Sequence, residues 1–501
     1  MAALTALVPI PASVTVDAAA PFTLAASTRL IAGAGAGATA ALAAQLIETV
    51  TGRLLPIASQ DAGSADIVLE MAGAGPAESY RLRAGTDGVR VTGADPAGLF
   101  YGMQTLAQLL AGDGRQVPAV TIADAPRFAY RGAMLDVARH FFPVATVTGV
   151  IDRAASLKLN HLHLHLTDDQ GWRIRLSSRP KLTEQAAGEC YTAADYAQIV
   201  DYAAARHVTI VPEVGGPGHT HAVGVAYPEL AGAPVITDAV RAATARFGGE
   251  LPVAGQPYRG VAVGFSSLRC DSDATYDFLA DVFGELAAMT PGPYLHVGGD
   301  EALGTPADDF AEYIRRVTAL VTASGKTPIA WHEAGAAAGL AAGTIGQYWG
   351  FRTPRDGMDG HARAFVANGG RMILSPADAI YLDMKYDLDT PLGLTWADGP
   401  TSVERSYRWE PVDVVPGAGP ADILGIEAPL WTETVRTAAD IDALAFPRVA
   451  AAAEIAWSPA PADHPQRNWA SFRARVGGLG ALWRRAGIDF FRSPEIDWEA
   501  P

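Results

Sequence analysis

Two adjacent carboxylates, Asp300 and Glu301, follow a short apolar run and two glycines in the segment YLHVGGDE, residues 294–301. The apolar residues alternate as in a buried strand, and the glycines let the backbone adopt angles closed to other residues or approach a neighbour closely. Adjacent acids in one cleft repel each other, which pushes their pKa values apart and suits one of them to proton transfer. The segment therefore predicts acid/base chemistry at a strand end, although a bare GGDE fits a solvated loop equally well.

Polar and aromatic residues also follow the other strands that we predict in the second part of the chain. They occupy residues 139–140, 167–169, 217–221, 331–333, 347–349, 381–383 and 431–433. Three of the 10 tryptophans, Trp331, Trp349 and Trp431, are among them. Tryptophan most often fills a core, but aromatic walls with carboxylates suit a sugar, whose C–H faces pack on rings while its hydroxyls bond to acids and Arg. Neither clustered Lys and Arg nor a Gly-rich loop indicates a phosphate substrate.

A repeating order of strand, loop and helix must bring these segments together. Eight strands are predicted at residues 132–138, 161–166, 208–214, 294–299, 328–332, 344–349, 371–375 and 423–428. Amphipathic helices are predicted at residues 145–158, 193–206, 273–289, 306–324, 360–368, 438–453 and 468–486. This order predicts a (β/α)8 TIM barrel over residues 126–501, in which the carboxyl ends of the strands build the active site. An open, doubly wound sheet is the alternative, but no Gly-rich nucleotide fingerprint follows the first strand.

Residues 1–125 form a different unit. Helical stretches at residues 39–51 and 96–111 are mixed with short strands at residues 65–71, 80–84 and 88–92. This mixture predicts a small α+β domain without chemistry of its own, because it has few His, Trp or clustered acids. Residues 121–127 are interpreted as the connection to the barrel.

The histidines at positions 161, 163 and 165 support a rival hypothesis. A spacing of two residues on a strand places the imidazoles on one face, where they could ligate a metal. With His219, His221 and Asp300 they would make the chain a metal-dependent barrel hydrolase. The same spacing suits histidines that donate hydrogen bonds to backbone or carboxylates inside the barrel, and this structural interpretation is favoured.

Composition narrows the class of partner. The chain has 501 residues, 49% of them hydrophobic and 18% charged, with a net charge of −16. Such a charge disfavours nucleic acid and anionic membranes, and no apolar run approaches membrane-spanning length. Residues 1–16 lack the pattern of an export signal, so the chain as written is expected not to be exported unless a leader has been removed. Only Cys190 and Cys270 are present, and whether they form a disulfide is left open.

Five sequence blocks resemble the signature blocks of glycoside hydrolase family 20, the β-N-acetylhexosaminidases, in particular its bacterial, actinomycete-type members. The blocks are residues 130–142, 163–173, 217–220, 296–301 and 430–433, and they occur in the order typical of the family. The resemblance covers residues 126 to about 495, and the N-terminal unit is similar to the small domain that precedes the family's barrel. It implies exo-hydrolysis of terminal β-linked GlcNAc or GalNAc from oligosaccharides or glycoconjugates, with no metal and no organic cofactor.

The resemblance also implies a role for individual residues. Glu301 would be the general acid/base, and Asp300 would hold the substrate's acetamido N–H while the acetamido oxygen closes an oxazolinium ion, an exception to the two-carboxylate scheme. Since consecutive residues of an extended strand point to opposite faces, we expect the two carboxylates to point apart. The remaining implied roles are as follows: Tyr381 binds the acetamido carbonyl, Trp331, Trp349 and Trp431 wall the pocket, Arg139, Asp383 and Glu433 bind sugar hydroxyls, and Asp168 with His219 forms a relay behind Glu301.

Two positions depart from the family pattern. Gly215 stands where an Asp usually precedes the Pro-Gly-His motif, and Ala138 stands where Ser or Thr is common. Both departures bear on hydrogen bonds behind the catalytic pair rather than on bond breaking. The sequence leaves open a lacto-N-biosidase-type enzyme that releases a disaccharide, which would need a pocket open beyond the first sugar. A non-catalytic sugar-binding protein is disfavoured, because Asp300 and Glu301 are both present.

Overall fold

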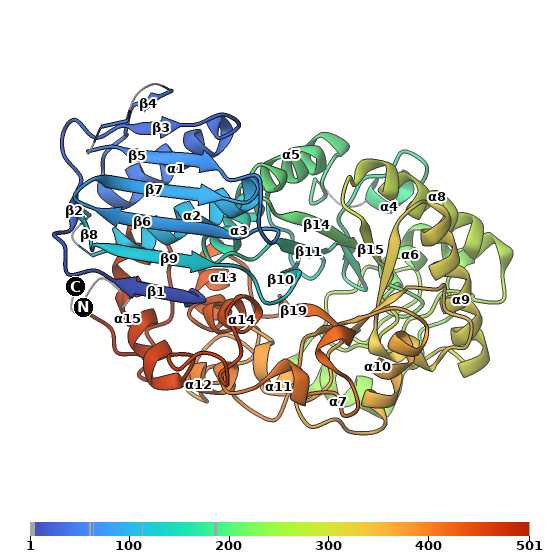
Figure 1. Cartoon of the computed structure of the whole chain (residues 1–501). Coiled ribbons are helices and arrows are strands. Elements are labelled where there is room, and N and C mark those ends of the chain that lie inside the picture. The colour runs from blue at the N-terminus through green and yellow to red at the C-terminus, as the bar shows by residue number, and fades with distance from the viewer. Residues whose placement is uncertain (1–5, 60–61, 64, 113, 185–187, 500–501) are drawn as a thin grey trace.

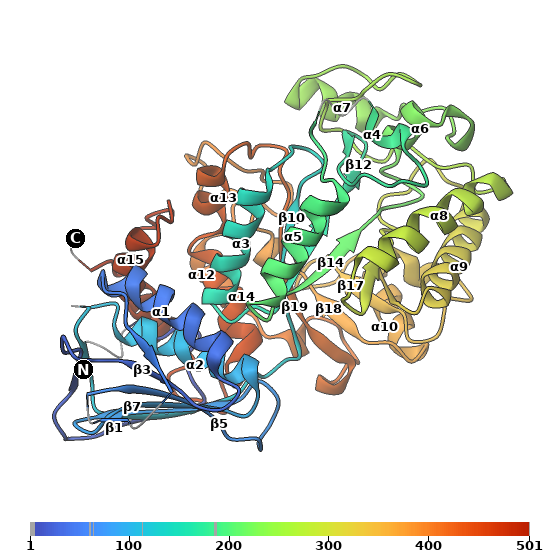
Figure 2. The same ribbon diagram turned by 90° about the horizontal axis from the view of Figure 1, so that it is seen from above.

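The computed structural model describes residues 6–59, 62–63, 65–112, 114–184 and 188–499. Its N-terminal part is a seven-stranded sheet in the order β1-β9-β6-β7-β5-β3-β4. The strands are β1 (Ser13–Val16), β3 (Leu30–Ala32), β4 (Ile57–Ala58), β5 (Ile67–Met71), β6 (Tyr80–Gly85), β7 (Gly88–Gly93) and β9 (Val120–Asp124). Helices α1 (Gly37–Thr51) and α2 (Pro96–Leu109) cover the face of this sheet that is turned toward the rest of the chain (Figures 1 and 2).

Strand β9 corrects one sequence interpretation. Residues 121–127 were expected to connect the two domains, yet Val120–Asp124 lies between β1 and β6 and pairs antiparallel with both. Val120 and Ile122 are buried under the helices while Thr121 is exposed, which is the alternation of a strand that is covered on one face. The chain leaves the sheet only after this strand. The boundary at residues 125/126 remains a prediction.

The second part is a closed barrel of eight parallel strands, as predicted. In order around the barrel they are β10 (Tyr130–Asp136), β11 (His161–His165), β14 (Thr209–Glu213), β15 (Tyr294–His296), β16 (Thr327–Trp331), β17 (Ile345–Tyr348), β18 (Met372–Leu374) and β19 (Ile423–Leu430). Helices α3 (Val144–Ser156), α5 (Ala193–Ala204), α8 (Asp273–Met289), α9 (Ala307–Ala323) and α10 (Met358–Ala367) connect them on the outside (Figure 2). Each strand predicted in this region has its counterpart, and so does each predicted helix but one; most of them are one to three residues shorter than predicted.

One predicted helix is in fact two. Residues 438–453 were expected to form a continuous helix, but α13 (Ala438–Ala445) ends before Phe446, and α14 (Arg448–Trp457) begins after Pro447. Proline lacks an N–H and forces the preceding residue out of the helical conformation, and Phe446 is accordingly extended (φ −97°, ψ 129°). The final predicted helix is α15 (Trp469–Arg485).

A long insertion between β14 and α8 covers one side of the barrel mouth. It contains α6 (His221–Ala226) and α7 (Asp238–Phe247), and it has a small core of its own formed by Val240, Tyr258, Ala262 and Phe265. The hairpin of β12 (Thr167–Asp168) and β13 (Gly171–Trp172) and the short α4 (Lys181–Glu184) lie beside it (Figure 2). None of the helices described is long and apolar enough to cross a membrane.

Candidate active site

The backbone after β15 turns sharply and brings both carboxylates to one imidazole. Gly298 (φ 73°) cannot be replaced freely, because an added Cβ would lie 2.7 Å from the Cα of Gly215. Glu301 also has a positive φ of 46°. As a result Asp300 Oδ2 lies 3.4 Å and Glu301 Oε2 lies 3.3 Å from Nε2 of His219. The expectation that the two acids point apart is therefore wrong, since the strand ends at His296 and the residues after it are not extended.

His219 continues into a chain of buried charges. Its Nδ1 lies 3.1 Å from Oδ1 of Asp168, whose other oxygen lies 2.9 Å from Nε2 of His165 and 3.0 Å from Nη2 of Arg139. Burial alone would lower the pKa of His219, but Asp168 and Asp300 raise it well above its ordinary value. Burial likewise disfavours the charge on Asp168, yet Arg139 and His219 hold its pKa well below the usual range. His219 is thus a cation placed directly behind the two acids.

The surroundings of Asp300 perturb its protonation. Burial raises the pKa of Asp300 to about 6, with Glu213 and Glu301 adding to the rise and His219 opposing it. Asp300 therefore changes charge close to neutral pH. Its side chain is 14% exposed, against 33% for Glu301, so Glu301 is the more accessible of the two to a leaving group.

The predicted aromatic residues meet in the barrel mouth. Ring centroids are 6.0 Å apart for Trp331 and Trp431 and 6.4 Å apart for Tyr381 and Trp431. Trp349 packs in the same apolar cluster as Tyr381 and Trp431, and its Nε1 donates to a carboxylate oxygen of Glu333 at 2.9 Å. These rings form a wall of the size and polarity that suit the methyl and C–H faces of an acetamido sugar.

The three residues predicted to bind hydroxyls lie at the other side of this wall. The guanidinium of Arg139 lies 4.8 Å from the Trp431 ring centroid. Both carboxylate oxygens of Asp383 and Oε2 of Glu433 are buried, without a hydrogen-bond partner of ordinary geometry in the described part of the chain. Burial raises the pKa of both carboxyls, and the charge of Glu433 raises the pKa of Asp383 further. A buried polar atom without a partner is costly, so these atoms are expected to bind hydroxyls of a ligand.

Three residues near Asp300 and Glu301 were not in the predicted set. Glu213 is fully buried: Oε1 accepts from Trp331 Nε1 at 2.8 Å, and Oε2 contacts His165. Burial raises the pKa of Glu333 to about 8, with Asp300 adding to the rise. Trp396 is 43% exposed and packs edge-on against other rings of the mouth. Glu333 follows a predicted strand and could have been found from that position, whereas nothing in the sequence around Trp396 indicates its place.

The barrel histidines do not gather as the metal hypothesis requires. His161 stacks on Tyr130 with ring centroids 3.9 Å apart, and burial lowers its pKa to about 3. His163 and His165 each have both ring nitrogens within 3.1 Å of carboxylates. His221 instead faces the carbonyl of Gln256 at 2.8 Å. Three groupings of described residues are close enough to hold an ion, and none includes more than one of the histidines at 161, 163 and 165. They are His163 with Glu213 and His296, Asp168 with Asp169 and His219, and His219 with Asp300 and Glu301. Their geometry fits charge-paired residues that position the site.

The two departures from the family pattern have different surroundings. An added Cβ at Gly215 would meet no atom within 4 Å, so the space of a larger side chain is open there. Ala138 is buried, and its carbonyl accepts from Nη2 of Arg173 at 2.8 Å. Cys190 and Cys270 are both buried free thiols, so no disulfide joins them.

Fold and site together define a class of enzyme. A parallel eight-stranded barrel presents an acid pair, an aromatic wall and unpaired buried carboxyls at one mouth. This combination is typical of a glycoside hydrolase built on a barrel.

Comparison with known proteins identifies the family. The model of the glycosyl hydrolase family 20 catalytic domain matches residues 128–307 and 303–460, and the model of domain 2 of that family matches residues 4–125. A β-N-acetylhexosaminidase of Cellulomonas fimi is 38% identical over 99% of this chain and 98% of its own length. A solved family 20 β-N-acetylglucosaminidase is 58% identical with a TM-score of 0.90, covering 99% of this chain and all of the other. The Streptomyces plicatus N-acetyl-β-hexosaminidase in complex with Thio-NAglucal is 42% identical with a TM-score of 0.89, covering 99% and 98%. The chain belongs to glycosyl hydrolase family 20.

Proposed function

We propose that this enzyme is an exo-β-N-acetylhexosaminidase that removes terminal β-linked GlcNAc or GalNAc with retention of configuration. The observation that carries the proposal is the convergence of Asp300 and Glu301 on one buried imidazole beside the aromatic wall. Related proteins support the substrate class: the Streptomyces plicatus enzyme is solved with Thio-NAglucal, and a variant of it is solved with GlcNAc as product.

Glu301 is the proton donor in this scheme. It protonates the glycosidic oxygen as the bond to the anomeric carbon breaks, and it later takes a proton from the water that attacks the same carbon. An ordinary retaining enzyme would need a second carboxylate on the opposite face of the sugar as nucleophile. Asp300 is poorly placed for that, because it faces the same imidazole nitrogen as Glu301.

The nucleophile is therefore the substrate's own acetamido oxygen. Asp300 accepts the acetamido N–H, which aims the oxygen at the anomeric carbon and offsets the positive charge that grows as the oxazolinium ring closes. Tyr381 donates to the same oxygen, and the tryptophan wall formed by Trp331, Trp349 and Trp431 packs on the methyl group and the sugar face. The imidazolium of His219, charged because of Asp168, stabilises Asp300 as an anion, and it stabilises Glu301 once Glu301 has given up its proton.

The hydroxyl edge of the sugar meets Arg139, Asp383 and Glu433. Arg139 supplies N–H donors, while the two carboxyls accept from or donate to hydroxyls according to their protonation. Burial raises the pKa of Asp383 well above its usual range, which favours the neutral form, and a neutral carboxyl can donate one hydrogen bond. The three residues select an equatorial or axial hydroxyl pattern by geometry rather than by net charge.

Asp300→Asn tests the mechanism. The change keeps the size of the side chain but removes the charge, so kcat should fall far more than KM rises, because the lost interaction belongs mainly to the transition state. A thiazoline that mimics the cyclised intermediate should bind the parent enzyme tightly and the variant much more weakly. Hydrolysis of chromogenic β-GlcNAc, β-GalNAc and β-glucoside substrates, with and without EDTA, gives the substrate range.

Three outcomes would contradict this mechanism. A 2-fluoro sugar with a good leaving group that leaves a covalent adduct on Asp300, located by mass spectrometry, would make Asp300 an ordinary nucleophile. Cleavage of the β-glucoside as fast as the β-GlcNAc substrate would show that the acetamido group takes no part. Loss of activity with EDTA would instead support a metal-dependent reaction.

A further inference from the structure

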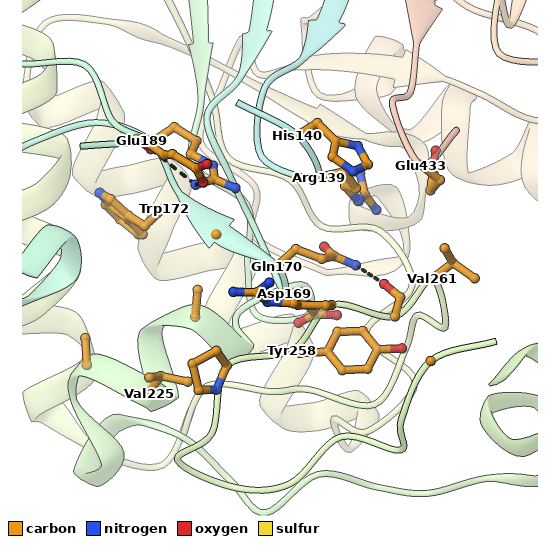
Figure 3. Close-up of a pocket in the computed structure, with 18 of the residues that line it drawn as sticks. Arg139, His140, Asp169, Gln170, Trp172, Glu189, Val225, Tyr258, Val261 and Glu433 are labelled. Atoms are coloured by element: carbon orange, nitrogen blue, oxygen red, sulfur yellow. Dashed lines mark hydrogen bonds and ion pairs between the residues drawn. The ribbon is translucent and has the colours of Figure 1, made fainter. Parts of the chain in front are cut away.

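A cavity of about 760 Å³ lies beside the sugar-binding residues, and no role described so far uses it. It is bounded by the β12–β13 hairpin, α4, and the insertion that carries α6 and α7 (Figures 2 and 3). Its volume falls within the range of about 300–1,000 Å³ that is typical of ligand pockets. The space exceeds what a water cluster needs and is sufficient for a sugar ring with its substituents.

The cavity adjoins the hydroxyl edge of the proposed sugar site rather than the scissile bond. Arg139 and Glu433 line it, whereas Asp300, Glu301 and Tyr381 do not. Figure 3 shows Arg139 and Glu433 on one side of the space, with the residues of the hairpin and the insertion across from them. A group that enters this cavity would therefore be attached to the non-reducing edge of the terminal sugar.

Positive charge is in excess around this space. Five of the lining residues are Arg or Lys and three are Asp or Glu, in a chain whose net charge is −16. Two of the five are matched: Arg173 faces Glu189 at 3.4 Å, and Arg139 pairs with Asp168 at 3.0 Å. The other three are Lys181, Arg259 and Arg436, which are exposed and make no ion pair with a carboxylate within the described residues.

Hydrogen-bond acceptors without partners lie on the same walls. Oδ2 of Asp169, a residue that is 1% exposed, and Oε1 of Gln170 have no partner in the described part of the chain. Gln170 is held in place because its Nε2 donates to the carbonyl of Gly260 at 2.8 Å, a bond drawn in Figure 3. Tyr258 adds an aromatic face beside them. Hydroxyl donors and an anionic group on one ligand would satisfy both the acceptors and the cations.

We propose that this cavity is a subsite for an anionic carbohydrate group attached to the non-reducing edge of the N-acetylhexosamine that is cleaved from the substrate. The group is either a sulfate ester on a terminal N-acetylhexosamine or an acidic sugar linked to the N-acetylhexosamine, in which case the two sugars leave together as a disaccharide. The inference rests on the proposed function, since Arg139 and Glu433 place the cavity relative to the sugar. Lys181, Arg259 and Arg436 bind the anion, and Asp169 and Gln170 accept hydroxyls.

The test compares four aryl glycosides that release the same 4-nitrophenol. They are 4-nitrophenyl β-GlcNAc, its 3-O- and 4-O-sulfates, and the 4-nitrophenyl β-glycoside of glucuronosyl-GlcNAc. The variant is Arg259→Ala/Arg436→Ala, and the matched control is Arg241→Ala, an exposed α7 arginine that does not line the cavity. We expect kcat/KM for an anionic substrate to fall about 5- to 20-fold in the double variant, as the loss of two exposed charge pairs predicts. The control, and the uncharged substrate in every protein, should change less than twofold.

Each outcome separates this inference from the proposed function. If uncharged 4-nitrophenyl β-GlcNAc is not hydrolysed, the proposed function fails. If it is hydrolysed but the parent enzyme cleaves none of the three anionic substrates, or the double variant and the control cleave them equally, this inference alone is overturned. Selective loss with the sulfates supports the ester as the anion, and selective loss with the disaccharide supports the acidic sugar. In either case high salt should reduce the difference between parent and double variant.

Discussion

Replacing Glu213 with Gln tests whether one buried carboxylate couples the acid/base relay to the aromatic wall. Its Oε1 accepts from Trp331 Nε1 at 2.8 Å and lies 3.1 Å from His296 Nδ1. Its Oε2 contacts His165 and lies 3.1 Å from His163 Nε2. Glutamine keeps the shape but removes the charge that these imidazoles need. Glu213 would then be a positioning residue, because it reaches the reacting groups only through its neighbours.

The magnitude follows from the charges that the carboxylate neutralises. Burial opposes a charged His165, but Glu213 and Asp168 raise its pKa from 6.5 to about 10, which corresponds to about 5 kcal/mol shared between two partners. Removing one member of a buried ion pair typically costs about 3–5 kcal/mol. We expect Glu213→Gln to lower the free energy of unfolding by about 3 kcal/mol and kcat by about tenfold, the difference between a charged and a neutral acceptor for Trp331.

The pH dependence of the stability loss has a defined direction. The depressed pKa of Glu213 stabilises the fold above its ordinary value of 4.5, and this contribution is lost as pH falls. The raised pKa values of His163, about 9, and His165, about 10, stabilise the fold fully below 6.5, and this contribution is lost as pH rises through those values. The gap between parent and variant should therefore be widest between pH 4.5 and 6.5 and should narrow toward pH 10.

Urea unfolding across this pH range and the pH profile of kcat are the assays. Glu189→Gln is the matched control, because this glutamate is 63% exposed and should change stability by less than about 0.5 kcal/mol. A Glu213→Gln protein with the parent's unfolding midpoint at pH 6 would refute the coupling of charges. A destabilised variant with unchanged kcat and an unchanged pH profile would limit Glu213 to holding the fold.

Three further predictions concern the site itself. The pKa of Asp383 is well above its usual range, so Asp383→Asn should mimic the neutral carboxyl and raise KM less than Asp383→Ala does. Steady-state kinetics on aryl β-GlcNAc measure the two KM values. Equal increases in KM would contradict a hydrogen-bond donor role for Asp383. Trp396→Ala should raise KM for aryl glycosides about 2- to 10-fold through lost ring contacts, while KM for the methyl glycoside should not change. An equal change in KM for both substrates would contradict a contact between Trp396 and the leaving group. The acid limb of kcat/KM should lie near pH 6, because Asp300 must be ionised and burial raises its pKa to about 6. With a dinitrophenyl leaving group that needs no protonation, Glu301→Gln should move this limb to lower pH, and an unmoved limb would assign it to another group.

The sequence by itself determined most of the elements and supplied the prediction that Asp300 and Glu301 are the bond-breaking pair. Buried barrel strands are short apolar runs followed by polar residues, and the helices between them are amphipathic, so both were visible as local patterns. The two wrong predictions of secondary structure arose where residues outside the local pattern decide the conformation. Pro447 divides an apolar period that otherwise reads as a single helix, and Val120–Asp124 is identified as a strand only by its partners β1 and β6.

Only the tertiary structure decided which residues of the site contact one another. Asp300 and Glu301 converge because positive φ angles at Gly298, Gly299 and Glu301 end the extended backbone, whereas the strand pattern predicted opposite faces. Glu213 contacts Trp331 across 118 residues, and Trp396 reaches the mouth from a loop. Such contacts depend on how the parallel strands close into a barrel, which brings distant residues together by register and not by any spacing along the chain. Local sequence determines which residues are available for chemistry, and closure of the barrel determines which of them meet.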